Sequence, residues 1–177
     1  MFINRSADVS HGSDGNLVRC FGCGGLFPDV SGPTHRYMEA TPGCWAAYGE
    51  VLARQYVDAG YATAGQMTVD AYAVQHPGTA SPQSIQSVAL HLISLCLMLE
   101  HSADAVAATQ IVARVAQDKS RFIWLTPPHA RGDINVSAVR AAQTAAEHLQ
   151  LVRAWGAAAW DAWSSHHDTV REWLPTR

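Results

Sequence analysis

The residue types best suited to bind a metal lie near the start of the chain. Cys20 and Cys23 form a Cys-x2-Cys pair in the stretch CFGCGG, and His35 and Cys44 follow in the same Gly/Pro-rich region. A Cys-x2-Cys turn brings two thiolates to one ion, and glycines permit the backbone angles that such a turn needs. Three thiolates and one imidazole are an ordinary tetrahedral zinc set. The sequence therefore predicts a zinc site formed by Cys20, Cys23, His35 and Cys44.

Spacing alone leaves alternatives open for these residues. With His35 off the metal, three cysteines and a water would make an open site able to activate that water. The same side chains can also be reduced thiols that hold no metal. A thioredoxin-like redox pair is less favoured, because no strand-helix-strand context surrounds Cys20 and Cys23. The cytidine-deaminase signature does not fit either, since its His-x-Glu precedes the cysteine pair.

A second group of polar residues is expected to form an acid–base pocket between helices. Asp70, Tyr72 and His76 lie together in TVDAYAVQH, and His91 lies on the polar side of SIQSVALHLISLCLMLE. Polar residues on an otherwise apolar helix face water or line a cavity. Side chains from facing helices can converge on one pocket, so we expect these four residues to be catalytic. For each histidine taken alone, a hydrogen-bonded core position is the simpler interpretation.

The elements that must position these residues are predicted to be helices. Helix-start signals, an N-cap residue followed by proline, occur at Thr41-Pro42 and at Ser81-Pro82. Further helices are expected from Thr68, over about 104–117, over about 137–163 and in HHDTVREWL. No segment shows the alternation of a strand. We therefore predict an all-α fold, a helical bundle with an N-terminal loop-rich zinc-binding segment.

Length and composition indicate one domain. The chain has 177 residues, of which 48% are hydrophobic and 15% charged, enough for one sizeable core and too few for two ordinary domains. We expect a single domain over 1–177. Its parts would be a partly flexible lead-in over 1–19, a zinc-binding loop region over 20–44 and a helical bundle over 45–177.

Charge and hydropathy restrict the partners and the location. The net charge is −3 and the basic residues are scattered, so nucleic-acid binding has no electrostatic support. No run approaches the ~20 apolar residues of a membrane span, and no signal-peptide core is visible at the N-terminus. We expect a cytoplasmic protein with a small-molecule substrate and no membrane or nucleic-acid partner, while homodimerisation stays open.

Several long blocks carry a resemblance to a known family. They are GPTHRYMEATPGCWAAYGEVLARQY, TVDAYAVQHPG and SIQSVALHLISLCLMLE. In these blocks the chain resembles an uncharacterised family of small bacterial proteins, a domain of unknown function that is common in actinobacteria. The resemblance extends from about Cys20 to the final HHDTVREWL. It implies a bacterial, cytoplasmic setting and a metal site, and it brings no activity.

Two functions are compatible with these features. The first is a zinc-binding bacterial protein that acts as an enzyme on a small molecule, through a pocket lined by His, Asp and Tyr. The alternative is a non-catalytic, zinc-stapled helical module for binding or regulation. A water-filled pocket lined by Tyr72, His76 and His91 would favour the enzyme. A closed core in which His91 bonds to backbone would favour the module.

Overall fold

The computed structural model of the protein describes residues 16–175, which are mostly helical. The strands are β1 (Leu17–Arg19) and β2 (Leu26–Pro28). The α-helices are α1 (Pro42–Val57), α2 (Ala59–Ala62), α3 (Gly65–Gln75), α4 (Pro82–Leu99), α5 (Ala105–Val115), α6 (Val136–Ala141), α7 (Ala145–Ala162) and α8 (His167–Glu172). The prediction of a helical fold is confirmed in this coarse form. Residues 1–15 of the expected lead-in lie outside the described range.

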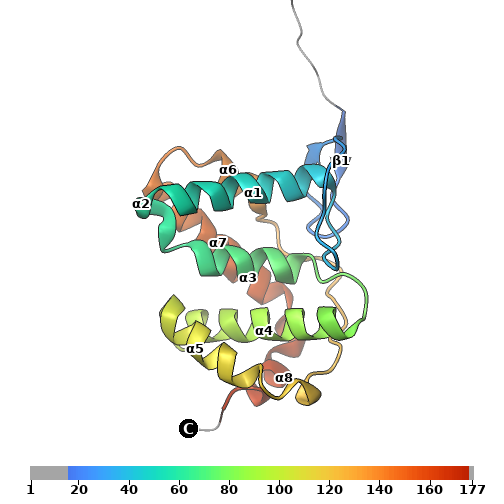
Figure 1. Cartoon of the computed structure of the whole chain (residues 1–177), viewed down its shortest axis with the longest axis vertical. Helices are drawn as coiled ribbons and strands as arrows, with labels where there is room; N and C mark the ends of the chain where they lie inside the picture. The colour runs from blue at the N-terminus through green and yellow to red at the C-terminus, as the bar shows by residue number, and fades with distance from the viewer. Residues whose placement is uncertain (1–15, 176–177) are drawn as a thin grey trace, which may run out of the picture.

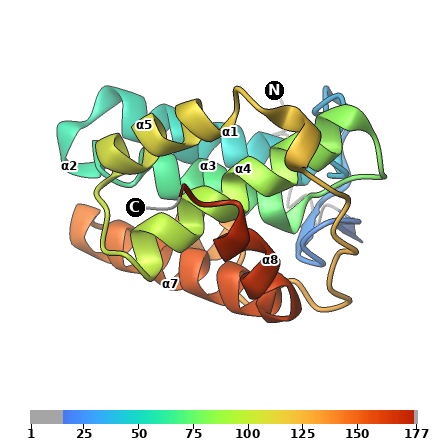
Figure 2. The ribbon, with the colours of Figure 1, turned by 90° about the horizontal axis from the view of Figure 1, so that it is seen from below.

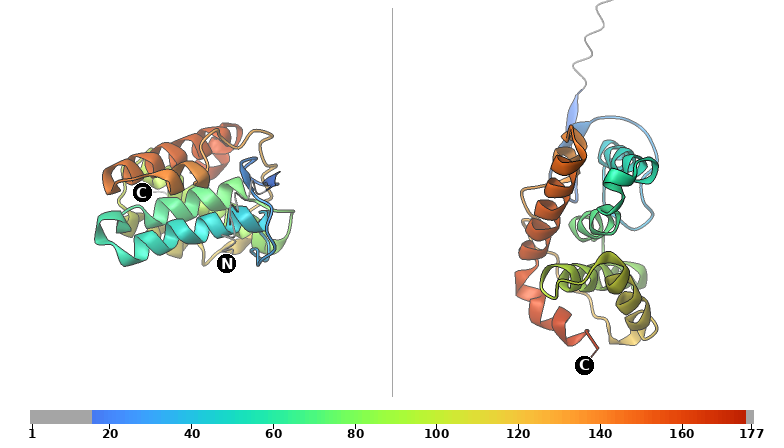
Figure 3. Two further views of the ribbon diagram at one scale, coloured as in Figure 1. Left: turned by 90° about the horizontal axis from the view of Figure 1, so that it is seen from above. Right: turned by 90° about the vertical axis from the view of Figure 1, so that its left-hand side faces the viewer.

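Two short strands correct the expectation of a chain built from helices alone. β1 and β2 pair antiparallel, with Val18 opposite Phe27, and the Cys-x2-Cys turn joins them. Phe27 is buried, and β2 contacts α1. At three residues each, the strands are too short to show a detectable alternation in the sequence. The hairpin lies at one end of the helices, near the start of α1 (Figures 1 and 3).

Helix α3 occupies the centre of the arrangement. It packs against α1, α4 and α7, and its residues from Asp70 to Gln75 are all buried. In Figure 1, α1, α3 and α4 lie one below the next, with α7 crossing behind them. Helices α5 and α8 both pack against α4, as Figure 2 shows from below. Each side of α3 therefore faces a different neighbour, so one short helix can supply residues to more than one site.

The predicted helix starts at two prolines are confirmed. Thr41 is the N-cap of α1 and Ser81 that of α4, each with proline in the first turn. The Ser81 hydroxyl accepts a hydrogen bond from the Ser84 amide, which satisfies one of the free donors at the helix start. These local signals fixed the elements that carry Cys44 and His91.

The single long helix expected over 137–163 is wrong, because α6 and α7 are separate helices. The chain leaves helical geometry at Ala142 and restarts at Thr144, whose hydroxyl accepts from the Glu147 amide. Glu147 in turn accepts from the amide of Gln143. This reciprocal arrangement resembles a capping box, and its Thr-x-x-Glu signature is present in the sequence. After α7, Ser164–His166 form a 3-10 turn, and the last helix, α8, follows it.

Within the described residues, α4 is the one helix long and apolar enough to cross a membrane by length and composition. The core helix of a folded domain passes the same test, and 56% of this window is buried inside the molecule. Its buried residues include Leu92, Ile93 and Leu95. Burial on this scale is the pattern of a helix surrounded by other helices.

An ion pair ties α8 to the end of α4 and gives a pH-dependent prediction. Arg171 donates to both carboxylate oxygens of Glu100, at 2.9 and 2.8 Å, and this pairing lowers the pKa of Glu100 to about 2. An unfolded glutamate titrates near 4.3, so the pair stabilises the fold above that pH and is lost as the pH falls toward 2. We expect Glu100→Gln to lower the melting temperature at pH 7.

The pH profile provides the control for this variant. The difference in melting temperature between wild type and Glu100→Gln should shrink as the pH falls below about 4, because Glu100 then takes up a proton in the unfolded chain while it stays ionised in the folded one. Thermal unfolding followed by circular dichroism between pH 2.5 and 7 measures it. A difference that stays constant over this range would show that the charge of Glu100 contributes nothing.

Candidate metal centre

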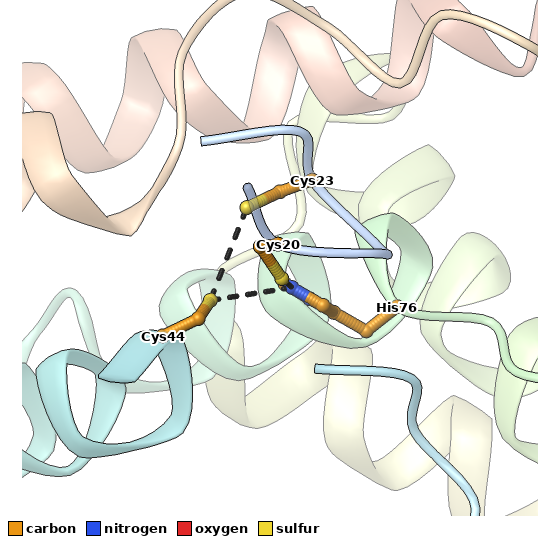
Figure 4. Close-up of side chains that lie close together, drawn as sticks. All are labelled: Cys20, Cys23, Cys44 and His76. Carbon is orange, nitrogen blue, oxygen red and sulfur yellow. Dashed lines mark hydrogen bonds between the residues drawn. The ribbon is translucent and has the colours of Figure 1, made fainter. Parts of the chain in front are cut away.

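Four buried side chains from three parts of the chain meet at one point. The Sγ atoms of Cys20, Cys23 and Cys44 and the Nε2 atom of His76 all lie within 4.8 Å of one another (Figure 4). Cys44 Sγ is 3.9 Å from Cys23 Sγ and 3.5 Å from His76 Nε2, and Cys20 Sγ is 3.4 Å from His76 Nε2. This group has the composition of a Cys3His metal site.

The β1–β2 hairpin sets the positions of Cys20 and Cys23. The Cys20 amide donates to the Gly25 carbonyl at 2.8 Å, and the Gly24 amide donates back to the Cys20 carbonyl at 3.1 Å. Gly24 has a φ of +71°, a left-handed conformation that glycine adopts without strain. These two bonds curl the turn so that both thiols point to the inside. Gly24 therefore provides a backbone angle of the kind that the sequence predicted for this turn.

Helix ends supply the other two side chains. Cys44 lies in the first turn of α1, and His76 is the C-cap residue of α3. The imidazole Nδ1–H donates to the Tyr72 carbonyl at 2.7 Å, which fixes the tautomer and leaves a lone pair on Nε2. Metal-bound histidines usually have such a partner on the second ring nitrogen. His76 is thus oriented to present Nε2 to the three sulfurs.

An aromatic stack supports the group from the side of α3. The Tyr72 ring lies parallel to the His76 ring at 4.0 Å between centroids, and Tyr48 stacks on its other face at 3.9 Å. The Tyr72 hydroxyl lies 3.5 Å from Cys44 Sγ, within reach to donate to a thiolate. Burial raises the pKa of Tyr72 above its usual value, so the phenol keeps its proton. Tyr72 is therefore a neutral donor beside the sulfurs.

The three thiols influence one another's protonation. Hydrogen bonds from Cys23 and Cys44 lower the pKa of Cys20 far below its ordinary value. The bond to Cys20 raises the pKa of Cys23 to about 12, and the pKa of Cys44 is raised by Cys20, Cys23 and burial. Without a cation the group therefore favours a single thiolate. A metal ion would replace the remaining thiol protons as it binds.

Arg131 fastens the cysteine turn to the end of α3. One guanidinium nitrogen, Nη1, lies 2.9 Å from the Gly22 carbonyl and 3.4 Å from the carbonyls of Phe21 and Gln75. Burial lowers the pKa of Arg131, opposed by the negative charges of Glu39, Cys20 and Cys23. A half-buried cation this near the sulfurs also offsets the negative charge of a metal–thiolate group. Sequence reasoning missed Arg131, because it lies in a loop over a hundred residues from the Cys20–Cys23 turn.

The structure places His35 outside the group of four and so corrects the predicted ligand set. Its ring packs against Tyr37 at 4.4 Å and Trp45 at 5.3 Å between centroids. Its Nδ1 is buried without a hydrogen-bond partner among the described residues, and burial lowers the pKa of His35. Proximity in sequence favoured His35 as the fourth ligand, but the connection between β2 and α1 places its ring away from the sulfurs. The packing of α3 places His76 beside them.

The four residues expected in one catalytic pocket are divided between two faces of α3. Tyr72 and His76 face the sulfurs. Asp70 accepts hydrogen bonds from His91 Nδ1 at 2.7 Å and from the Ser94 hydroxyl at 2.6 Å, facing α4. Asp70 and Tyr72 are two positions apart in α3, about 200° around the helix axis, so their side chains face opposite sides. The polar side of α4 does line a cavity, as the sequence indicated.

Gly22 lets the cysteine turn approach His76. A Cβ atom at this position would clash with His76 Cδ2 and lie 2.6 Å from the Glu39 carbonyl oxygen. We expect Gly22→Ala to lower the free energy of unfolding by about 1–3 kcal/mol, the usual cost of forcing extra atoms into a packed site. Equilibrium urea denaturation followed by circular dichroism measures the effect.

The matched control for this variant is Gly49→Ala. Gly49 is exposed in α1, and a Cβ there meets nothing within 4 Å. Alanine in a helix interior is favoured over glycine by up to about 1 kcal/mol, so this variant should be neutral or stabilised. Equal effects of the two substitutions would contradict the close approach of Gly22 to His76.

Comparisons with known proteins identify a family and no function. The model of a family of unknown function, DUF5946, matches residues 18–164, which include all four side chains of the group. Searches of curated proteins and of solved structures found no match to the chain. The geometry of the sites therefore carries the functional argument.

Proposed function

We propose that this chain, which belongs to the family of unknown function DUF5946, is a zinc-binding protein. The ion would have a structural role in a closed tetrahedral site. Its ligands would be the side chains of Cys20, Cys23, Cys44 and His76.

The distances between the ligand atoms carry this proposal. Tetrahedral zinc with Zn–S near 2.3 Å and Zn–N near 2.0–2.1 Å requires about 3.8 Å between sulfurs and about 3.5 Å between sulfur and nitrogen. The separations here are 3.9 Å for Cys23–Cys44, 3.5 Å for Cys44–His76 and 3.4 Å for Cys20–His76. Thiolate and imidazole ligands also disfavour Mg²⁺ and Ca²⁺, which prefer oxygen.

Coordination number and burial favour a structural over a catalytic ion. With His76 as fourth ligand, no coordination position is left for a water, in contrast to the open three-cysteine site. The exposed fractions of Cys20, Cys44 and His76 are 2%, 0% and 1%, and that of Cys23 is 9%, so little of the group is accessible to a substrate. A bound zinc ion would supply charge neutralisation and four bonds that hold the surrounding segments together. This geometry favours the zinc-stapled module over a metal-dependent enzyme.

The segment that a bound zinc ion would hold in place lies between β2 and α1. Residues 29–40 form neither helix nor strand, and Cys23 and Cys44 flank this stretch. Long segments without regular structure need an external constraint to hold one conformation. An ion bound at both flanks and at the end of α3 provides that constraint. The proposed function of the zinc is therefore to fix the N-terminal hairpin and this segment onto the helices.

Paired histidine variants test the ligand set. Protein purified with metal-free buffers under reducing conditions should contain one zinc per chain by atomic emission. His76→Gln should reduce zinc affinity at least tenfold, since it removes one of four ligands, and should lower the melting temperature. His35→Gln should keep full zinc content, because that ring lies outside the group of four and packs against Tyr37 and Trp45.

Cobalt substitution gives an independent readout of the geometry. The wild-type cobalt protein should show thiolate charge-transfer bands and the intense visible bands of a tetrahedral ion, and His76→Gln should alter them. Zinc-free wild-type protein that is fully folded under reducing conditions and takes up no added zinc would contradict the proposal. So would a normal zinc content in His76→Gln together with its loss in His35→Gln.

A further inference from the structure

We propose that a cavity between α3, α4 and α5 binds a small uncharged polyhydroxy molecule, with Nε2 of His91 accepting a hydrogen bond from one ligand hydroxyl. The cavity has a volume of about 310 Å³. That is the lower end of the usual range for small-molecule sites. None of the residues that carry this inference is a ligand of the proposed zinc ion, so it does not rest on that function.

A buried carboxylate orients His91. The Asp70 side chain is fully buried and accepts hydrogen bonds from His91 Nδ1 at 2.7 Å, from Ser94 at 2.6 Å and from Gln66 at 2.9 Å. An ionised carboxylate only accepts hydrogen bonds, so His91 must carry a proton on Nδ1. In the neutral imidazole, Nε2 is then an acceptor. Asp70 is a positioning residue, because it acts through His91.

The Nε2 atom of His91 is available to a ligand. Among the residues that the structure describes, no side chain or backbone group forms a hydrogen bond to it, and the side chain is 23% exposed. His91 and Asp70 both line the cavity, along with Ser94. A carboxylate–imidazole pair that borders a cavity is the usual arrangement of a functional histidine, whereas a purely structural pair has no reason to border one.

The remaining lining determines the class of ligand. Gln66, Gln86, Ser87 and Thr109 are neutral groups that both donate and accept hydrogen bonds, as hydroxyl groups of a ligand do. Among residues 16–175, no lysine or arginine lines the cavity, so a phosphate or carboxylate ligand would find no counter-charge there. Tyr37 also lines the cavity, and an aromatic residue there suits the C–H face of a cyclic polyol. A cyclic polyol fits this lining better than an anion or an apolar molecule.

Nuclear magnetic resonance of ¹⁵N-histidine-labelled protein tests the proposal directly. Long-range ¹H–¹⁵N spectra at pH 7.5 should show His91 as the neutral tautomer with its proton on Nδ1. Titration with D-glucose or myo-inositol should shift the His91 Nε2 signal in a saturable manner. D-glucose 6-phosphate should cause no saturable shift, because the cavity offers no cation.

Variants separate positioning from folding. Asp70→Asn should abolish the single tautomer of His91 and weaken polyol binding about tenfold, as expected for loss of a charge-assisted bond. Because Asp70 is buried, the half-buried Ser87→Ala is a second variant, and it should weaken binding while leaving the tautomer unchanged. His101→Gln, an exposed histidine just beyond α4, should change neither property.

Several outcomes would overturn the proposal. They are a His91 that carries its proton on Nε2 at pH 7.5, the absence of a saturable shift with both neutral polyols, and binding of the phosphorylated sugar as tight as that of glucose. Since the zinc content of Asp70→Asn and Ser87→Ala should equal that of wild type, failure here is distinguishable from failure of the metal site.

Discussion

The arrangement of the N-terminal third of the molecule depends on one constraint, the meeting of three buried sulfurs and one buried imidazole nitrogen. Three thiols placed 3.4–3.9 Å from their neighbours gain little from one another in an apolar setting, since sulfur forms weak hydrogen bonds. A divalent cation turns the same arrangement into four strong bonds. The fixed tautomer of His76, the Tyr72 hydroxyl and the nearby Arg131 all suit a negatively charged metal–thiolate group.

Helix α3 connects this group to the cavity on the other side. Its eleven residues present His76 and Tyr72 to the sulfurs and Asp70 to α4. Almost every residue of its second half is buried, so the helix has little freedom to rotate. Polar residues that look crowded in the sequence are thus distributed to two separate environments. The burial of Asp70, Gln75 and His76 is tolerated because each has hydrogen-bond partners.

Local signals in the sequence predicted most of the helices and three of the four sulfur or nitrogen positions of the metal centre. Proline after an N-cap residue located α1 and α4, and the Cys-x2-Cys pair located a tight turn, although the two strands that it joins were not predicted. Local signals could not show whether His35 or His76 lies beside the three sulfurs, because this depends on how α3 packs against α1. His76 was placed in the expected acid–base pocket instead, because Asp70 and Tyr72 are its neighbours in the sequence. The break at Ala142 was missed even though its capping residues, Thr144 and Glu147, are visible.

The position of Tyr37 has a consequence for the relation between the two sites. This residue belongs to the segment that Cys23 and Cys44 flank, and it lines the cavity. Its carbonyl oxygen also sits against Gly78, two residues after His76, where a side chain would not fit. The segment that Cys23 and Cys44 flank therefore contributes to the cavity as well. By thermodynamic reciprocity, if an ion at the group of four favours this position of Tyr37, an occupant of the cavity that favours the same position would in turn strengthen ion binding.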